Sequence, residues 1–110
     1  MAGKFVISKS SNGQFRFNLK ASNGQVILAS EQYESKDGAK NGIESVKKNA
    51  ADAARFEKDT AKNGEFFFRL KSGNSQVIGM SEMYKSEAAR DNGIESVMKN
   101  APDASVEDEA

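Results

Sequence analysis

The segment NGIESVKKNA at residues 41–50 recurs almost unchanged as NGIESVMKNA at residues 92–101. Outward from these two copies, a shift of 51 residues aligns residues 12–50 with residues 63–101, and about 23 of the 39 pairs are identical. Two copies are too few for a solenoid, which needs at least about three repeats to bury a continuous core. The sequence therefore predicts two similar units that pack with pseudo-twofold symmetry.

The repeated segment has the spacing of an amphipathic helix. In the first copy the apolar residues that share one helical face are Ala39, Ile43, Val46 and Ala50. The second copy keeps Ile94, Val97 and Ala101, whereas Arg90 stands in place of Ala39 and narrows the stripe. Ser35 and Ser86 are the predicted N-caps. The segment thus encodes a docking helix rather than a catalyst.

A glycine lies on the inner face of each predicted helix, at Gly42 and Gly93. Because a glycine within a helix costs roughly 1 kcal/mol relative to alanine, we expect a compensating close approach of helix to sheet. The alternative is that the Asn41-Gly42 pair breaks the first helix in two.

Three strands are expected before each helix. In the first unit they are Lys4–Lys9, residues 15–20 and Gln25–Ser30, separated by turn signals at Asn12-Gly13 and residues 22–24. The second unit repeats the pattern, with Phe66, Phe68 and Leu70 pointing inward and turns at Asn63-Gly64 and Gly73-Asn74. We expect one compact domain over residues 1–110, with repeat one at residues 1–51 and repeat two at residues 52–110.

Composition excludes several classes of function. The chain has 110 residues, with 16 Lys and Arg against 16 Asp and Glu, so its formal net charge is zero. This balance disfavours nonspecific nucleic-acid binding and a polybasic membrane anchor. There is no cysteine and no histidine, so we expect no disulfide, no metal site and no cofactor. Residues 1–11 lack the apolar run of a signal peptide and no apolar stretch is long enough for a membrane span, so we expect a cytoplasmic protein.

The repeated motifs resemble a known family. NG-x-F-x-F-x-LK, QVI, SE-x-Y-x-S and GI-x-SV-x-x-N recur in order, and their arrangement is similar to that of the YegP-like family of small bacterial proteins. The resemblance implies an α+β fold of two β-β-β-α-β units, which share one mainly antiparallel sheet with the helices on one face and exchange their last strands. It further implies that residues 55–60 bridge the units and that residues 105–109 form a final short strand. The family provides no established activity.

The outward row of the second strands is the first candidate binding site. It contains Arg16 and Lys20 in unit one and Phe67, Arg69 and Lys71 in unit two. Basic residues with an aromatic on an open sheet are typical of single-stranded nucleic-acid binding. The alternative is an ordinary solvated sheet face, which the zero net charge favours.

The third strands are apolar on both faces, at residues 26–29 and 77–80. Only one face can meet the helices, so the other could form a partner or ligand surface together with Val6 and Phe67. The alternative is that these strands lie at the centre of the sheet and are covered by the opposite unit.

A second candidate site lies just before each helix, where Glu31 and Tyr33 recur as Glu82 and Tyr84. These residues could supply a base and an acid in a polar pocket. The alternative is a structural connection in which the tyrosine packs at the rim of the sheet.

Three classes of function follow from these features, with no catalytic residue assigned. The favoured class is a non-catalytic binding or interaction module with a protein or small-molecule partner. A weak single-stranded nucleic-acid binder and an enzyme using Glu and Tyr are the alternatives. We expect a monomer, because the second repeat supplies an internal partner for the first.

Overall fold

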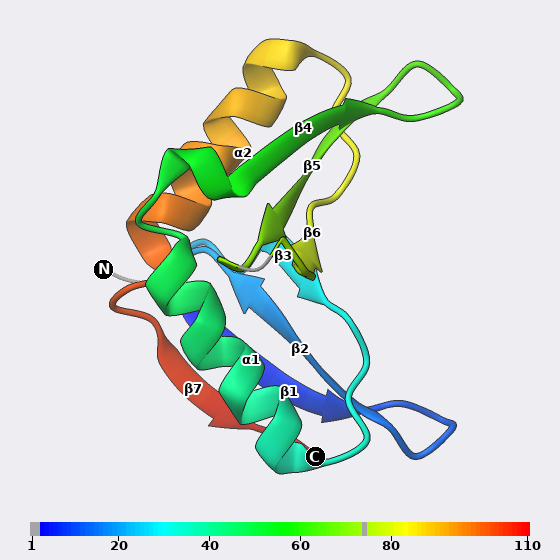
Figure 1. The fold of residues 1–110 in the computed structure, drawn as a ribbon, viewed down its shortest axis with the longest axis vertical. Helices are drawn as coiled ribbons and strands as arrows, with labels where there is room; N and C mark the ends of the chain where they lie inside the picture. Colours follow the sequence, from blue (N-terminus) through cyan, green and yellow to red (C-terminus); the bar gives the residue numbers. More distant parts are fainter. Residues whose placement is uncertain (1–2, 74) are drawn as a thin grey trace.

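The computed structural model describes residues 3–73 and 75–110, and in this part of the chain two helices pack against a seven-stranded sheet (Figure 1). The elements in chain order are β1 (Lys4–Lys9), β2 (Phe15–Lys20), β3 (Val26–Ser30), α1 (Lys36–Asn49), a 3-10 turn (Ala53–Arg55), β4 (Phe56–Thr60), β5 (Phe66–Lys71), β6 (Val77–Met80), α2 (Glu87–Asn100) and β7 (Ser105–Asp108). The predicted α+β fold of two tandem repeats is confirmed.

The strands follow the spatial order β4-β5-β6-β3-β2-β1-β7. Each repeat contributes an antiparallel meander, and the two meanders join where Ala29 pairs with Met80 and Ser30 with Gly79. The third strands β3 and β6 therefore lie at the centre of the sheet, which is one of the two placements the sequence allowed.

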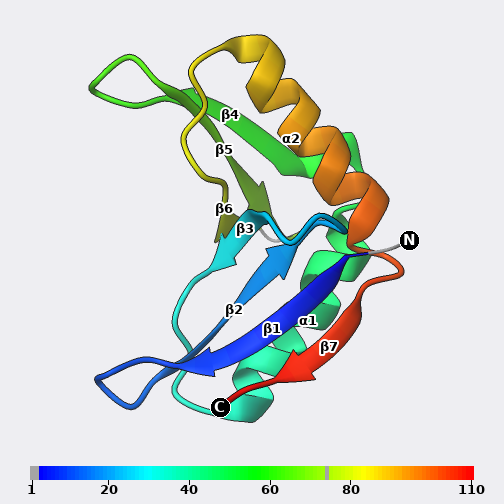
Figure 2. The same ribbon diagram turned by 180° about the vertical axis from the view of Figure 1, so that it is seen from behind.

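Both helices cover the same face of this sheet. Apolar residues of α1, α2 and strands β1 to β6 belong to one buried cluster. The sheet twists so strongly from end to end that its two halves turn this face in different directions. Figure 1 therefore shows α1 in front of β1 and β2 but α2 behind β4, and Figure 2, from the opposite side, shows the reverse. Neither helix in the described residues is long and apolar enough to cross a membrane.

The helices begin where the sequence predicts. The Ser35 side chain accepts a hydrogen bond from the Gly38 amide, and the Ser86 side chain accepts one from the Ala89 amide. The predicted apolar stripe is buried in each helix. Arg90 does not leave a gap in the second stripe, because its side chain is itself buried and its guanidinium lies 5.4 Å from the centre of the Phe66 ring.

The helices are continuous through Gly42 and Gly93, so neither glycine breaks its helix. A Cβ atom on Gly42 would lie 2.8 Å from Cζ of Tyr33 and 2.9 Å from Cε2 of Phe17. Gly93 meets Tyr84 in the same way. The expected close approach is therefore present, and it involves the tyrosine before the helix as well as the sheet.

The hairpin turns depend on residues in the left-handed region. Gly13, Gly24 and Gly64 have φ values of 85°, 84° and 86°. The residue equivalent to Gly24 in the second unit is Ser75, which adopts φ 68° despite its side chain. Asn74, which the sequence places in this turn, lies outside the described residues.

The strands that follow the two helices form the two edges of the sheet, and of these only β7 crosses from its own repeat to the other. β4 follows α1 and pairs antiparallel with β5 of the second meander, whereas β7 follows α2 and pairs parallel with β1 of the first. The acidic end of the chain is held by Lys4, 3.2 Å from Glu107, and by Lys36, 3.0 Å from Asp108. The last strand that the family resemblance implied is thus present, ending at Asp108.

Candidate binding surfaces

The outward side chains of β5 are paired with acids from the neighbouring strand. Glu57 and Asp59 of β4 lie opposite Arg69 and Phe67 in the ladder. One guanidinium nitrogen of Arg69 lies 3.0 Å from a carboxylate oxygen of each acid, and Nζ of Lys71 lies 2.9 Å from Glu57. The basic row of the second unit is therefore largely neutralised.

These ion pairs change the proton affinity of the carboxylates. Hydrogen bonding from Lys71, with a further contribution from Arg69, lowers the pKa of Glu57. The Thr60 amide and then Arg69 lower the pKa of Asp59. Both carboxylates are thus held in the charged form that pairs with the cations.

The Phe67 ring offers little free surface. Only 6% of the residue is exposed, and the guanidinium carbon of Arg69 lies 4.7 Å from the ring centre. Aromatic residues that bind single-stranded nucleic acid present an open ring face for a base to stack upon. In this structure the guanidinium of Arg69 lies over the Phe67 ring, where a base would have to stack.

The structure does not bring the whole predicted basic row together. Arg16 and Lys20 lie on β2, and β3 and β6 separate them from β5. Arg16 is exposed, whereas Lys20 is half-buried and lies opposite Lys4 in the ladder. The row therefore forms two groups on different halves of the sheet.

The rim tyrosines are packed into the structure. Tyr33 is half-buried and stacks on Phe17 with ring centres 6.1 Å apart, and Tyr84 stacks on Phe68 at 6.4 Å. The Tyr33 amide and carbonyl both bond the backbone of Phe15 at 2.7 Å. These tyrosines anchor the strand-to-helix connections at the rim of the sheet.

Burial also changes the chemistry of the tyrosines. It raises the pKa of Tyr33, and the charge of Glu31 raises it further. Burial and Glu82 have the same effect on the pKa of Tyr84. Both phenols therefore stay protonated near neutral pH and act as hydrogen-bond donors or acceptors.

A hollow of about 810 Å³ lies between β6 on one side and α1 with its preceding connection on the other. Glu31 and Tyr33 line it from the connection before α1, and Arg69 lines it from β5. Val77, Ile78 and Met80 of β6 form its apolar part, and Met80 is 40% exposed. The hollow thus joins residues from both candidate sites, which sequence reasoning had treated separately.

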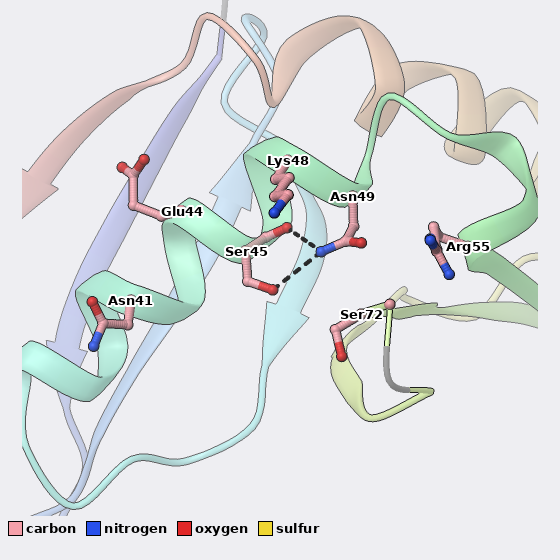
Figure 3. Close-up of a pocket in the computed structure, with 8 residues that line it drawn as sticks. Asn41, Glu44, Ser45, Lys48, Asn49, Arg55 and Ser72 are labelled. Atoms are coloured by element: carbon pink, nitrogen blue, oxygen red, sulfur yellow. Dashed lines mark hydrogen bonds between the residues drawn. The ribbon is translucent and has the colours of Figure 1, made fainter.

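The repeated GIESV segments line two further hollows, each between the helix of one repeat and a turn of the other. The first, of about 600 Å³, lies between α1 and the β5–β6 turn (Figure 3), and the second, of about 430 Å³, lies between α2 and the β2–β3 turn. Nδ2 of Asn49 donates to the Ser45 carbonyl at 2.8 Å and to its hydroxyl at 3.2 Å. Asn100 binds Ser96 in the same way. Ser45 and Ser96 therefore hold the asparagine side chain at the end of each helix.

Within residues 3–73 and 75–110, no three metal-ligating side chains gather into a candidate ion site. On the open face of the sheet, charged groups gather in an ion-pair network of Arg69, Lys71, Glu57 and Asp59. That network consists of balanced pairs, so its carboxylates already have their cations.

The chain matches known proteins over nearly its whole length. The family described as "Domain of unknown function (DUF1508)" matches twice, at residues 10–57 and 61–108. A UPF0339 protein in the ptx operon 5′ region of Stutzerimonas stutzeri is 58% identical over 96% of each chain. The UPF0339 protein YegP of Escherichia coli strain K12 is 52% identical over 98% of each chain.

Two solved structures share the fold. The solution NMR structure of YegP from Escherichia coli, described as a protein of unknown function, superposes with a TM-score of 0.94 and is 51% identical, covering 99% of this chain and 94% of that one. The NMR structure of a UPF0339 protein from Shewanella oneidensis has a TM-score of 0.92 and is 56% identical, covering 98% and 92% of the two chains. None of these descriptions states an activity.

Proposed function

The chain belongs to the DUF1508 family in its tandem form, and we propose that it is a non-catalytic binding module whose ligand site is the hollow between β6 and α1. The single observation that carries the proposal is the make-up of this hollow. Tyr33 and Arg69 provide polar groups around an apolar wall that includes the exposed Met80. A hollow of 300–1000 Å³ with a few converging polar groups is typical of small-molecule sites. We expect a small ligand with an apolar body and a polar or anionic end.

Two observations favour this proposal over a nucleic-acid surface. Arg69 and Lys71 are paired with acids of β4, and Phe67 is covered by Arg69. A nucleic acid would have to displace both sets of contacts before it gained phosphate contacts or base stacking.

The rim residues fit binding better than acid–base catalysis. A general acid works best with a pKa near the operating pH, and burial raises the pKa of Tyr33 away from neutrality. Glu31 is exposed to solvent and lines the mouth of the hollow. The pair is therefore suited to orient a ligand.

We also propose that the protein acts as a monomer in the cytoplasm. The second repeat already occupies the position that a second copy would take across the β3–β6 joint. Light scattering over a dilution series tests the first part, and a dimer that persists on dilution would contradict it. Cell fractionation tests the second.

The experiment compares immobilised wild-type protein with two variants. Met80→Trp fills the hollow from an exposed position, and Met83→Trp places the same bulk at an exposed methionine outside the residues that line it. Each protein is incubated with the low-molecular-mass fraction of a bacterial extract, and retained compounds are identified by mass spectrometry.

The proposal expects at least one compound that wild type and Met83→Trp retain and Met80→Trp loses. Retention by all three proteins, or by none, would show that the hollow is not a ligand site. Chemical conversion of the retained compound by wild type alone would support the enzyme alternative instead.

A further inference from the structure

The two outer edges of the sheet are built differently. On one side β7 covers β1 in parallel, with Val106 opposite Phe5, and the Glu109 amide donates to the Ile7 carbonyl at 2.8 Å. On the other side β4, the strand equivalent to β1, is the last strand of the sheet. In the described sheet β4 therefore has a neighbouring strand on one side, whereas its equivalent β1 has one on both sides.

The backbone of β4 faces this edge as the backbone of β1 faces β7. The Phe68 amide and carbonyl bond Ser81 on the β6 side at 3.0 and 2.9 Å. Lys58 lies directly opposite Phe68, so its own amide and carbonyl point away from β5, because the pairs of an antiparallel ladder alternate. Lys58 is the equivalent of Ile7, whose carbonyl receives β7.

The side chains beside this edge are less well covered than their equivalents. Phe5 is 0% and Ile43 is 1% exposed, whereas the corresponding Phe56 is 9% and Ile94 is 7% exposed. Phe56, Ile94 and Met98 line a groove of about 330 Å³ between β4 and α2. An apolar groove thus lies beside the edge at the place where the symmetry puts a strand.

The charges around the two edges are reversed. In the first repeat Lys36 binds Asp108 of β7 at 3.0 Å, and Lys40 also lowers the pKa of Asp108, after Lys36 and the Ala110 amide. Glu87 and Asp91 take the positions of these two lysines on α2, and Glu95 also borders the groove. Lys58 lies 3.1 Å from Asp91 and Arg90 lies 3.5 Å from the same carboxylate, so two cations stand against three carboxylates and the groove keeps an excess of negative charge.

We propose that the groove between β4 and α2 binds an extended basic segment of a partner protein, which adds to the sheet parallel to β4 as β7 adds to β1. Addition of a strand to a sheet edge takes affinity from backbone hydrogen bonds and specificity from alternate side chains. The segment places an apolar side chain against Phe56 and basic side chains toward Asp91 and Glu95. This surface is separate from the hollow beside Met80.

A second copy of the chain fits the groove poorly. Its C-terminal strand carries Glu107, Asp108 and Glu109, which the carboxylates of α2 would repel. Antiparallel pairing of β4 with itself about Lys58 would place Glu57 opposite Asp59 twice. Charge thus selects a basic partner over a second copy.

The test uses two nine-residue peptides and the whole protein. One peptide has the sequence of residues 101–109, and the other has lysine at the three acidic positions 107–109. Each is titrated into isotope-labelled protein while amide chemical shifts are followed by NMR. We expect the basic peptide to shift amides of β4 and α2 and to bind about tenfold or more tightly than the acidic one. Addition of salt weakens this binding.

A charge-reversed variant is the matched control. Glu87→Lys together with Asp91→Lys places lysine at the α2 positions equivalent to Lys36 and Lys40 of α1, and both positions are exposed. This variant, once its amide spectrum shows that it is folded, should bind the acidic peptide in preference to the basic one. No binding of the basic peptide up to its solubility limit, equal binding of both peptides, or shifts away from β4 and α2 would each overturn the proposal. The first result would mean that Lys58 serves only to block the edge.

Discussion

The phenol ring of Tyr33 lies so close to the backbone of Gly42 that no larger residue fits in α1 at this point, and Tyr84 and Gly93 repeat the arrangement in α2. Each tyrosine is also stacked on a core phenylalanine, so it has little room to move away. The pair therefore fixes the distance between the rim of the sheet and the helix that follows it.

Replacement of Gly42 by alanine is expected to destabilise the protein by about 1–3 kcal/mol, the usual cost of overpacking. This is the reverse of the usual effect in a helix, where the same change stabilises by roughly 1 kcal/mol. Urea unfolding of Gly42→Ala measures the difference. In a Tyr33→Leu background the cost should become smaller, because the ring that the new methyl group meets is absent. An equal cost in both backgrounds would show that the close contact is not responsible.

Replacement of Ser75 by glycine is expected to stabilise the protein by about 0.5–1 kcal/mol. Ser75 holds φ 68°, a conformation that costs an L-residue roughly 1–2 kcal/mol, and the greater freedom of glycine in the unfolded chain offsets part of the gain. The equivalent Gly24, with φ 84°, offers the reverse experiment. Gly24→Ser should lower the unfolding free energy by a similar amount. Thermal and urea unfolding measure both, and a less stable Ser75→Gly protein would contradict this account.

The parts of the fold that the sequence predicts are those that depend on neighbouring residues. The N-caps Ser35 and Ser86 and the apolar spacing of both helices are local signals, and the structure contains them as predicted. The parallel strand β7 has no such signal, because its run of acids is typical of a solvated end. It follows from the family resemblance, and in the structure its backbone pairs with β1 while Lys4 and Lys36 neutralise two of its acids.

The candidate surfaces could not be predicted from the sequence, because they depend on which residues of neighbouring strands lie opposite each other. Nothing in the spacing of the chain places Glu57 beside Arg69, because twelve residues and a turn separate them. The β4–β5 register brings them together and turns an expected basic row into ion pairs. The hollow that joins Tyr33 to Arg69 likewise depends on the two-residue joint between β3 and β6, which no local pattern encodes.

The ion pairs of Arg69 predict a dependence on pH. Because the pKa of Glu57 and of Asp59 is lower in the folded protein than in the unfolded chain, these pairs stabilise the fold above the unfolded pKa values and lose that effect as pH falls through the folded ones. An NMR titration of the side-chain carboxyl carbons should find both values below the usual range. In Arg69→Gln both pKa values should rise, with Lys71 still lowering that of Glu57. Unchanged values in the variant would contradict the assigned pairs.

Removal of residues 105–110 is expected to destabilise the protein by about 1–2 kcal/mol, because Phe5 and Val6 lose the strand that covers their edge of the sheet. An uncovered edge also pairs readily with other chains, so the truncated protein should form dimers or larger species as its concentration rises. Urea unfolding and size-exclusion chromatography measure the two effects. The peptide of residues 101–109 added in excess should restore both stability and the monomer, because a ligand that binds only the folded state stabilises it. A truncated protein as stable and as monodisperse as the full chain would mean that β7 contributes nothing to the fold. If truncation destabilises the protein but the peptide does not restore it, β7 stabilises the fold only when it is covalently attached.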